Sequence, residues 1–186
     1  FWRNSLCDVA RGTAIGGADN RVGSLLARVA MSTMALGMGG LFWLLPHHFE
    51  PRPRMRLASP SSMTAIATWV RALGLVSVPG AIAVTFMPTD RFGVLHGVAI
   101  VVAGVPGLGA AVLAMIALLR SRRLRRSAMA VVGLATLLVA ALDFGLYVHE
   151  LATNGGPRLA VPVLERVAAL GLALWMVLIA RRTLTT

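Results

Sequence analysis

The chain has 186 residues, of which 57% are hydrophobic and 13% are charged, and its mean hydropathy is +0.77. A soluble domain carries about 25% charged residues, so this composition excludes a soluble fold and indicates an integral membrane protein. The net charge of +11 comes from arginines that stand mainly at the ends of apolar runs, where anionic lipid headgroups account for them. We therefore expect no nucleic-acid partner. The single cysteine, Cys7, excludes an internal disulfide and a cysteine-based metal cage.

Residues 1–21 form a turn-rich segment with room for one short helix at the extracytoplasmic membrane interface. This segment is followed by several apolar runs. As helices, these runs are long enough to cross a hydrocarbon core of about 30 Å. They cover residues 25–45, 63–86, 92–119, 128–148 and 161–180. The sequence therefore predicts an all-α membrane bundle of five transmembrane helices, with residues 22–182 as one helical domain and residues 183–186 as a tail. Because the chain begins with Phe1, we also expect a sixth helix to precede it.

The run Arg120 to Arg126 has five arginines in seven residues and lies between two apolar runs. Short basic loops remain on the cytoplasmic side of a membrane, so this loop fixes the direction of every span. The basic loop at 52–56 and the tail after Arg181 and Arg182 then fall on the same, cytoplasmic side. All basic residues are arginine, and alanine and glycine are abundant, which is typical of a GC-rich bacterial genome. We therefore expect a multi-pass protein of the bacterial inner membrane.

Most acidic residues fall at the opposite, outer side in this orientation. Asp143 is the most informative of them, because a carboxylate inside a span is costly unless it is paired, protonated or turned toward the bundle interior. Asp143, Tyr147 and Glu150 are spaced i, i+4 and i+7, so they share one helix face, which we expect to point inward. The predicted outer pocket consists of Asp8, Asp90, His96, Asp143, Tyr147, Glu165 and Arg166, with Asp143 and Asp90 as the candidate catalytic residues.

Arg71 is the candidate partner of Asp143, because the two side chains lie at similar depths in their spans. A buried ion pair between them would lock two helices together. In the alternative interpretation, Arg71 extends to the headgroups on the cytoplasmic side and Asp143 has another role.

Two histidines at the outer side raise the question of a metal. His96 and His149, together with Asp8 and Asp90, could complete a tetrahedral zinc shell with or without water. In the alternative interpretation, both histidines are ordinary hydrogen-bonding residues at the membrane interface.

Three short motifs carry a resemblance to known families. Residues 4–8 (NSLCD), residues 87–91 (MPTDR) followed by His96, and residues 162–166 (PVLER) resemble uncharacterised bacterial polytopic membrane proteins of the Frag1-like and related domain-of-unknown-function families. The resemblance implies about six spans. More distantly, Asp and His at outer helix ends resemble the membrane hydrolase superfamily that includes the alkaline ceramidases, where a zinc held by three histidines activates water for amide hydrolysis. This chain lacks the closing His-x-x-x-His pair of that superfamily.

Two functions from different classes follow. The first is binding of a lipid or other amphiphile in the outer polar pocket without catalysis, or service as an accessory subunit in a homo- or hetero-oligomer within the membrane. The second is metal-dependent hydrolysis of a lipid amide or ester, with His96, His149, Asp8 and Asp90 as zinc ligands and Asp143 handling a proton. Whether the protein is an enzyme is left open by the sequence.

Overall fold

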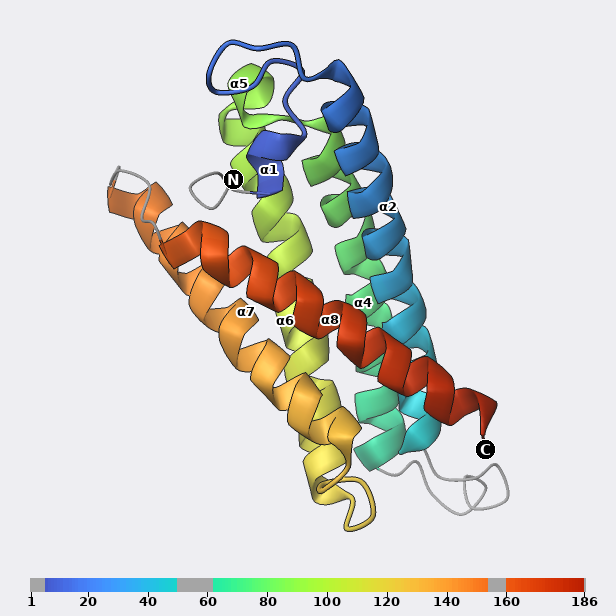
Figure 1. Cartoon of the computed structure of the whole chain (residues 1–186). Helices are drawn as coiled ribbons and strands as arrows, with labels where there is room; N and C mark the ends of the chain where they lie inside the picture. The colour runs from blue at the N-terminus through green and yellow to red at the C-terminus, as the bar shows by residue number, and fades with distance from the viewer. Residues whose placement is uncertain (1–5, 50–61, 154–159, 186) are drawn as a thin grey trace.

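The computed structural model describes residues 6–49, 62–153 and 160–185, and every long element within them is a helix (Figure 1). Five helical segments are long and apolar enough to cross a membrane, so the predicted all-α bundle of five spans is confirmed. The spans are α2 (Arg21–Leu44) with its 3-10 continuation η1 (Leu45–His48), α4 (Ser62–Phe86), α6 (Val94–Arg120), α7 (Ala128–Thr153) and α8 (Ala160–Leu184).

Two short helices lie at one end of the bundle. They are α1 (Leu6–Val9) and α5 (Thr89–Phe92). The third span was predicted to begin at residue 92, but Gly93, with φ +44°, separates α5 from α6, and α6 begins at Val94. This backbone conformation favours glycine, because other residues meet a steric clash there. We call this end of the bundle the α1 end.

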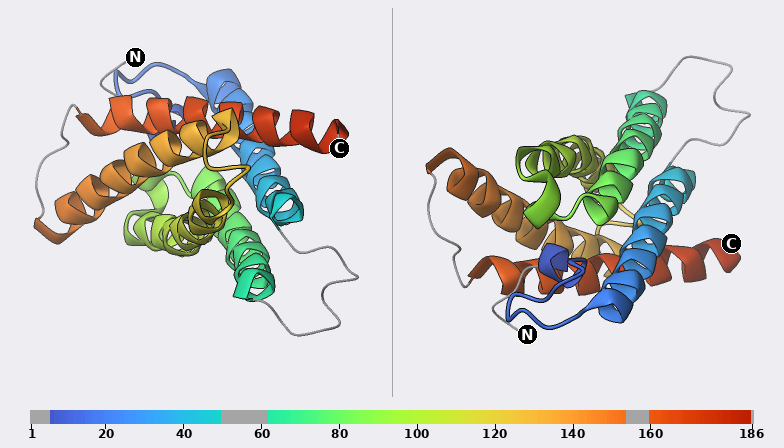
Figure 2. Two further views of the ribbon diagram at one scale, coloured as in Figure 1. Left: turned by 90° about the horizontal axis from the view of Figure 1, so that it is seen from below. Right: turned by 90° about the horizontal axis from the view of Figure 1, so that it is seen from above.

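Neighbouring spans follow the order α2, α4, α6, α7, α8, and α8 returns to α2, so the five helices form a closed ring. Seen end-on, α8 crosses the other helices obliquely (Figure 2). The turn at 120–127 and the basic residues Arg181 and Arg182 share the end opposite α1, which we call the arginine end. There the crossing of α8 over α2 is fixed by Thr183 Oγ1 and His48 Nε2, which lie 3.2 Å apart.

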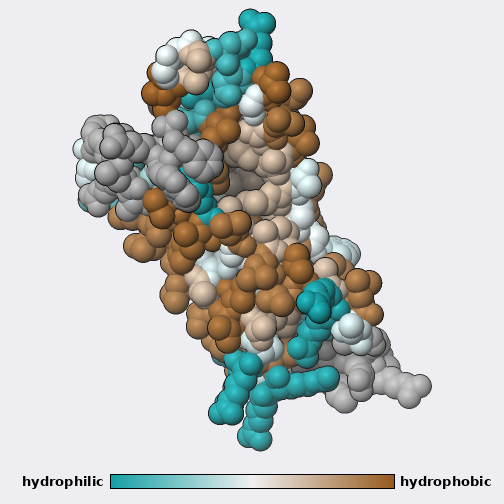
Figure 3. Space-filling view, in the orientation of Figure 1, coloured by the Kyte–Doolittle hydropathy of each residue, from teal (hydrophilic) through white to brown (hydrophobic). Residues whose placement is uncertain are grey.

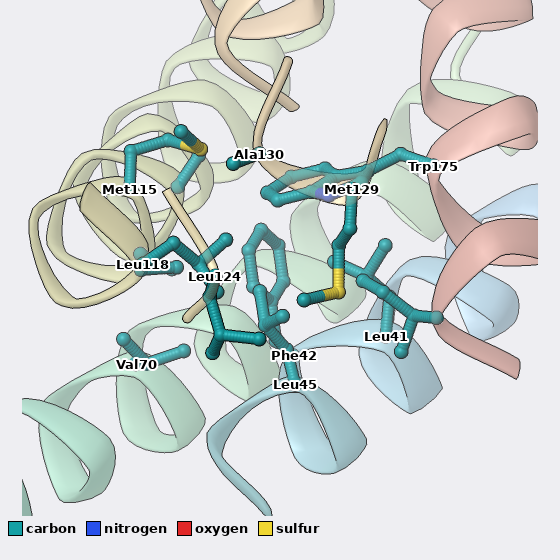
Figure 4. Close-up of a cluster of buried hydrophobic side chains, with 14 residues drawn as sticks. Leu41, Phe42, Leu45, Val70, Met115, Leu118, Leu124, Met129, Ala130 and Trp175 are labelled. Carbon is teal, nitrogen blue, oxygen red and sulfur yellow. The ribbon is translucent and has the colours of Figure 1, made fainter. Parts of the chain in front are cut away.

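The packed apolar core occupies the arginine end of the ring. Its side chains point toward one another from the spans and from the turn between α6 and α7 (Figure 4). The largest of them is Trp175 of α8, which is 1% exposed. The other labelled members are Leu41, Phe42, Leu45, Val70, Met115, Leu118, Leu124, Met129 and Ala130.

Glycines allow the spans to approach one another closely. A Cβ atom on Gly80 of α4 would lie 2.6 Å from the backbone nitrogen of Ala103 on α6, and one on Gly133 of α7 would lie 2.6 Å from the indole ring of Trp175. Helices in lipid gain little from the hydrophobic effect between them, so van der Waals contact through small residues carries much of their association. The outer surface is correspondingly apolar, with hydrophilic side chains gathered at the two ends (Figure 3).

The contact at Gly80 makes the first testable prediction. We expect Gly80→Ala to lower the thermal unfolding midpoint of the detergent-purified protein, because the added methyl group meets backbone atoms of α6 that cannot move aside. Overpacking of this kind costs about 1 to 3 kcal/mol. The matched control is Gly40→Ala on α2, where a Cβ atom would meet nothing within 4 Å. An unchanged midpoint in Gly80→Ala would show that α4 and α6 are farther apart than described.

Candidate functional site

A cavity of about 380 Å³ lies inside the ring, toward the α1 end. Its volume is within the range of about 300 to 1,000 Å³ that is usual for small-molecule sites. All five spans and α1 contribute side chains to it, and most of these are apolar. The larger apolar residues of the wall are Leu6, Met31, Met34, Met38, Phe42, Ile100, Leu108, Leu137, Phe144, Leu172 and Trp175.

The cavity is elongated along the bundle. Trp175 marks its inner limit, where the packed core begins. Glu165 lies ten residues earlier on α8, a separation of about 15 Å along the helix axis at 1.5 Å per residue. On α7, Asp143 lies at the same distance from Gly133, the glycine that contacts Trp175. The two carboxylates therefore mark one end of the cavity and the indole ring marks the other.

The carboxylates differ from the other polar groups that line the cavity. The hydroxyl group of Thr85 donates to the carbonyl oxygen of Ala81 on its own helix, at 3.0 Å. Glu165 Oε2 accepts a hydrogen bond of 2.6 Å from the backbone nitrogen of Leu6. Asp143 Oδ1 is buried and, among the residues that the structure describes, has no hydrogen-bond partner. An acceptor of this kind in apolar surroundings is costly unless a ligand or a proton satisfies it.

Helix α1 covers the rim of the cavity, and Leu6 and Cys7 face into it. Several contacts hold the segment that follows α1. The carbonyl oxygen of Ala10 accepts hydrogen bonds from Ser24 Oγ at 2.7 Å and from Arg28 Nη2 at 3.3 Å, both on α2. Asn20 adds two bonds from its side-chain amide to the carbonyl oxygens of Val9 and Arg11. Part of the cavity wall is thus a short segment tethered at a few points.

The surface is hollowed beside this segment. Figure 3 shows a recess below the α1 end, in the region bounded by α1, α2 and α8. The α2 residues Met31 and Met34 and the α8 residues Ala168 and Ala169 line the cavity on this side. The two helices meet closely farther toward the arginine end, where a Cβ atom on Gly37 would lie 3.0 Å from the sulfur of Met176. The opening therefore lies between spans and faces sideways from the bundle.

Only two of the residues predicted to form the outer pocket line the cavity. Asp143 and Glu165 both line the cavity. Asp8 and Asp90 lie outside it, and each is close to Arg11, whose guanidinium nitrogens are 3.7 Å from Asp8 Oδ1 and 3.9 Å from Asp90 Oδ2. The pair between Arg11 and Asp90 connects the segment that follows α1 to α5.

The other members of the predicted pocket have positions outside the cavity lining. His96 is buried, and its Nδ1 donates to the carbonyl oxygen of Met87 at 2.5 Å, beyond the end of α4. Arg166 is buried and its Nη1 donates to the carbonyl oxygen of Pro162 on the same helix. Tyr147 is half-buried one turn beyond Asp143. Residues Asn4 and Ser5 of the first resemblance motif lie outside the described residues.

The predicted zinc shell is not assembled. The side chain of His96 is hydrogen-bonded to the carbonyl oxygen of Met87, and His149 is exposed on α7. Asp8 and Asp90 both lie close to Arg11. Within residues 6–49, 62–153 and 160–185, no three His, Cys, Asp or Glu side chains are grouped so that they could hold a metal ion. The prediction was wrong because sequence spacing does not show which helix ends meet.

The predicted ion pair between Arg71 and Asp143 is also absent. Helix α6 lies between α4, which carries Arg71, and α7, which carries Asp143. Arg71 Nε instead donates to the carbonyl oxygen of Trp43 at 3.4 Å, and its guanidinium lies 5.7 Å from the centre of the Trp43 ring. The prediction was based on the similar depth of the two side chains in the membrane, but the helices that carry them are not neighbours.

The sequence interpretation missed the apolar part of the site. Met31, Met34 and Met38 are spaced i, i+3 and i+7, so they form one stripe on α2, and all three line the cavity. This spacing was a usable signal. The contributions of Cys7 and Trp175 could not be read in the same way, because they depend on where α1 and α8 pack.

Comparison with protein-family models, with curated proteins and with solved structures finds no match to this chain. The Frag1-like and ceramidase-like resemblances therefore remain predictions. The site has to be interpreted from its own geometry.

The surroundings of Cys7 make a second prediction. Burial and the nearby Glu165 carboxylate raise the pKa of the Cys7 thiol to about 12. At about pH 8, iodoacetamide should alkylate Cys7 in the folded protein about a hundredfold more slowly than an ordinary thiol, because the thiolate is the reacting form. Gly16→Cys combined with Cys7→Ser supplies the exposed control thiol. If Cys7 and the control thiol were alkylated at equal rates in the folded proteins, the burial of Cys7 would be contradicted. In dodecyl sulfate, where the protein is unfolded, the two thiols should react at equal rates, which checks the reagent.

Proposed function

We propose that this membrane protein binds the chain of a lipid or other amphiphile in the cavity between its five spans. The observation that carries the proposal is the cavity itself, which has apolar walls, one carboxylate-bearing end and an opening that faces sideways between α1, α2 and α8. An amphiphile matches this distribution, because its apolar chain suits the wall of methionines and leucines while its polar group suits the carboxylates.

The physical gain from occupancy supports the same proposal. A void gives the side chains around it no partner atoms on one side, so their dispersion attraction is incomplete. An alkyl chain supplies the missing partner atoms and needs no hydrogen bonds from the wall. Methionine side chains are flexible and polarizable, so the stripe formed by Met31, Met34 and Met38 can adapt to chains of different shape.

The proposal includes an orientation. Arg120, Arg181, Arg182 and the arginines of the turn that follows α6 gather at one end of the ring. The positive-inside rule supports placing this end in the cytoplasm of a bacterial cell and the α1 end outside. The opening of the cavity would then lie in the outer half of the membrane.

Quenching of Trp175 fluorescence tests the binding proposal. We use a variant in which Trp2, Trp43 and Trp69 are replaced by Phe, reconstituted in vesicles of dibrominated phosphatidylcholine. Trp175 is 1% exposed but lines the cavity, so bromine can quench it from within the cavity. We expect clear quenching, approaching that of a variant that retains Trp69 alone, which is 60% exposed.

Two matched variants separate occupancy from loose packing. Ala140 lines the cavity, whereas its neighbour Ala141 is exposed on α7. Ala140→Phe fills part of the cavity and should reduce the quenching of Trp175, whereas Ala141→Phe should leave it unchanged. The proposal would be overturned if Trp175 were not quenched in the parent variant while Trp69 was quenched normally in the variant that retains Trp69 alone.

Labelling from the two sides of the membrane tests the orientation. In a Cys7→Ser background, Gly16→Cys at the α1 end should react with a membrane-impermeant maleimide in intact bacterial cells. Thr185→Cys, at the arginine end, should react after the membrane is permeabilised. The reverse order of labelling would show that the bundle is inserted the other way.

A further inference from the structure

We propose that the amphiphile bound in the cavity carries a cationic ammonium head group. This inference rests on the proposed binding function and names the chemical class of its ligand. Two carboxylates line one end of the cavity, while three of the arginines that the structure describes near this end make contacts outside the cavity.

The charged side chains that line the cavity are carboxylates, which accept hydrogen bonds. Asp143 from α7 and Glu165 from α8 both line it, while the described residues that line it include no arginine or histidine. Because Asp143 Oδ1 is buried without a partner among the described residues, the site contains an acceptor that the protein leaves unsatisfied. Glu165 Oε2 receives one backbone hydrogen bond, from Leu6, and a carboxylate can accept several more.

Three of the described arginines near this end of the bundle make contacts outside the cavity. Arg11 lies beside Asp8 and Asp90. Arg28 donates to the carbonyl oxygen of Ala10, and Arg166 donates to that of Pro162 on its own helix. None of these three arginines lines the cavity. Among the described residues, no arginine lines the cavity beside the two carboxylates, so a ligand can supply a cation there.

The chemistry of the carboxylates then discriminates among head groups. A primary ammonium group donates up to three hydrogen bonds and forms charge-assisted bonds with carboxylates, which are stronger than bonds between neutral groups. An alcohol makes a weaker, neutral bond. A head group with a net negative charge would place like charges side by side in apolar surroundings, which disfavours binding. The expected order of affinity is amine, then alcohol, then acid.

Three probes with the same chain and different head groups test the inference. They are ω-bromoundecylamine, ω-bromoundecanol and ω-bromoundecanoic acid, each titrated into vesicles of unbrominated phosphatidylcholine that contain the Trp175-only protein. Glu165 and Trp175 are about 15 Å apart along α8, so a bromine at the far end of the chain is carried toward the indole ring. The Trp69-only variant reports how much of each probe enters the bilayer, and the quenching of Trp175 is compared at equal quenching of Trp69.

We expect the amine to half-quench Trp175 at a concentration about tenfold lower than the alcohol, which corresponds to one charge-assisted hydrogen bond. The acid should be the weakest of the three. Asp143→Asn and Glu165→Gln, made separately, should each reduce the preference for the amine and leave the affinity for the alcohol nearly unchanged. The order of the three probes on the parent protein needs neither variant, so a variant that fails to fold does not remove the test.

The possible outcomes separate this inference from the proposed function. Equal or tighter binding of the alcohol or the acid overturns the cationic head group while the cavity stands as an amphiphile site. A preference for the amine that persists in both carboxylate variants also overturns the inference, because the selectivity then arises elsewhere. If none of the probes quenches Trp175 and brominated phosphatidylcholine also fails to do so, both proposals are wrong.

Discussion

The contact between Trp175 and Gly133 divides the ring into two halves with different properties. The indole ring lies so close to α7 that a Cβ atom at position 133 would overlap it, and it joins the packed core at the arginine end. Toward the α1 end, the same side chain is the inner wall of the cavity. One large residue packed against one small residue therefore completes the core and closes the cavity from below. The positions of α7 and α8, and with them Asp143 and Glu165, depend on this contact.

The hollow half follows from the geometry of the helices as much as from the sizes of their side chains. Helix α8 crosses α2 closely near Gly37 and Met176, and it crosses the bundle obliquely, so the two helices separate toward the α1 end. There, alanines of α8 and methionines of α2 face each other across the cavity. The bundle closes the gap partly with α1, a single helical turn held by a hydrogen bond to Glu165 and by bonds of the adjacent segment to α2. Such a segment has few buried contacts, so local opening there costs less than opening of the core.

The sequence predicted the elements well and their neighbours poorly, for a physical reason. Apolar runs of about 20 residues define spans without reference to other parts of the chain, because each helix satisfies its own backbone in lipid. Which spans touch is decided by side-chain packing across the ring. The pairing of Arg71 with Asp143 failed because α6 intervenes, and the zinc shell failed because His96 bonds to Met87. Two members of the predicted outer pocket, Asp143 and Glu165, line the cavity in the structure. For Asp143, the cost of a carboxylate in a span already restricts where it can face.

That cost also bears on what the cavity is for. At the position of Asp143, an apolar side chain of similar size would pack against the same wall without leaving an unsatisfied acceptor, and stability alone would favour it. The structure instead places Asp143 Oδ1 where no described residue bonds to it, in a cavity whose remaining walls are nearly all apolar. Departures from the rules of local stability are expected at functional sites, where a ligand supplies the missing interaction. A ligand with a hydrogen-bond donor can therefore relieve the cost of burying Asp143, and a ligand that also fills the apolar length of the cavity restores dispersion attraction to the side chains that surround the void.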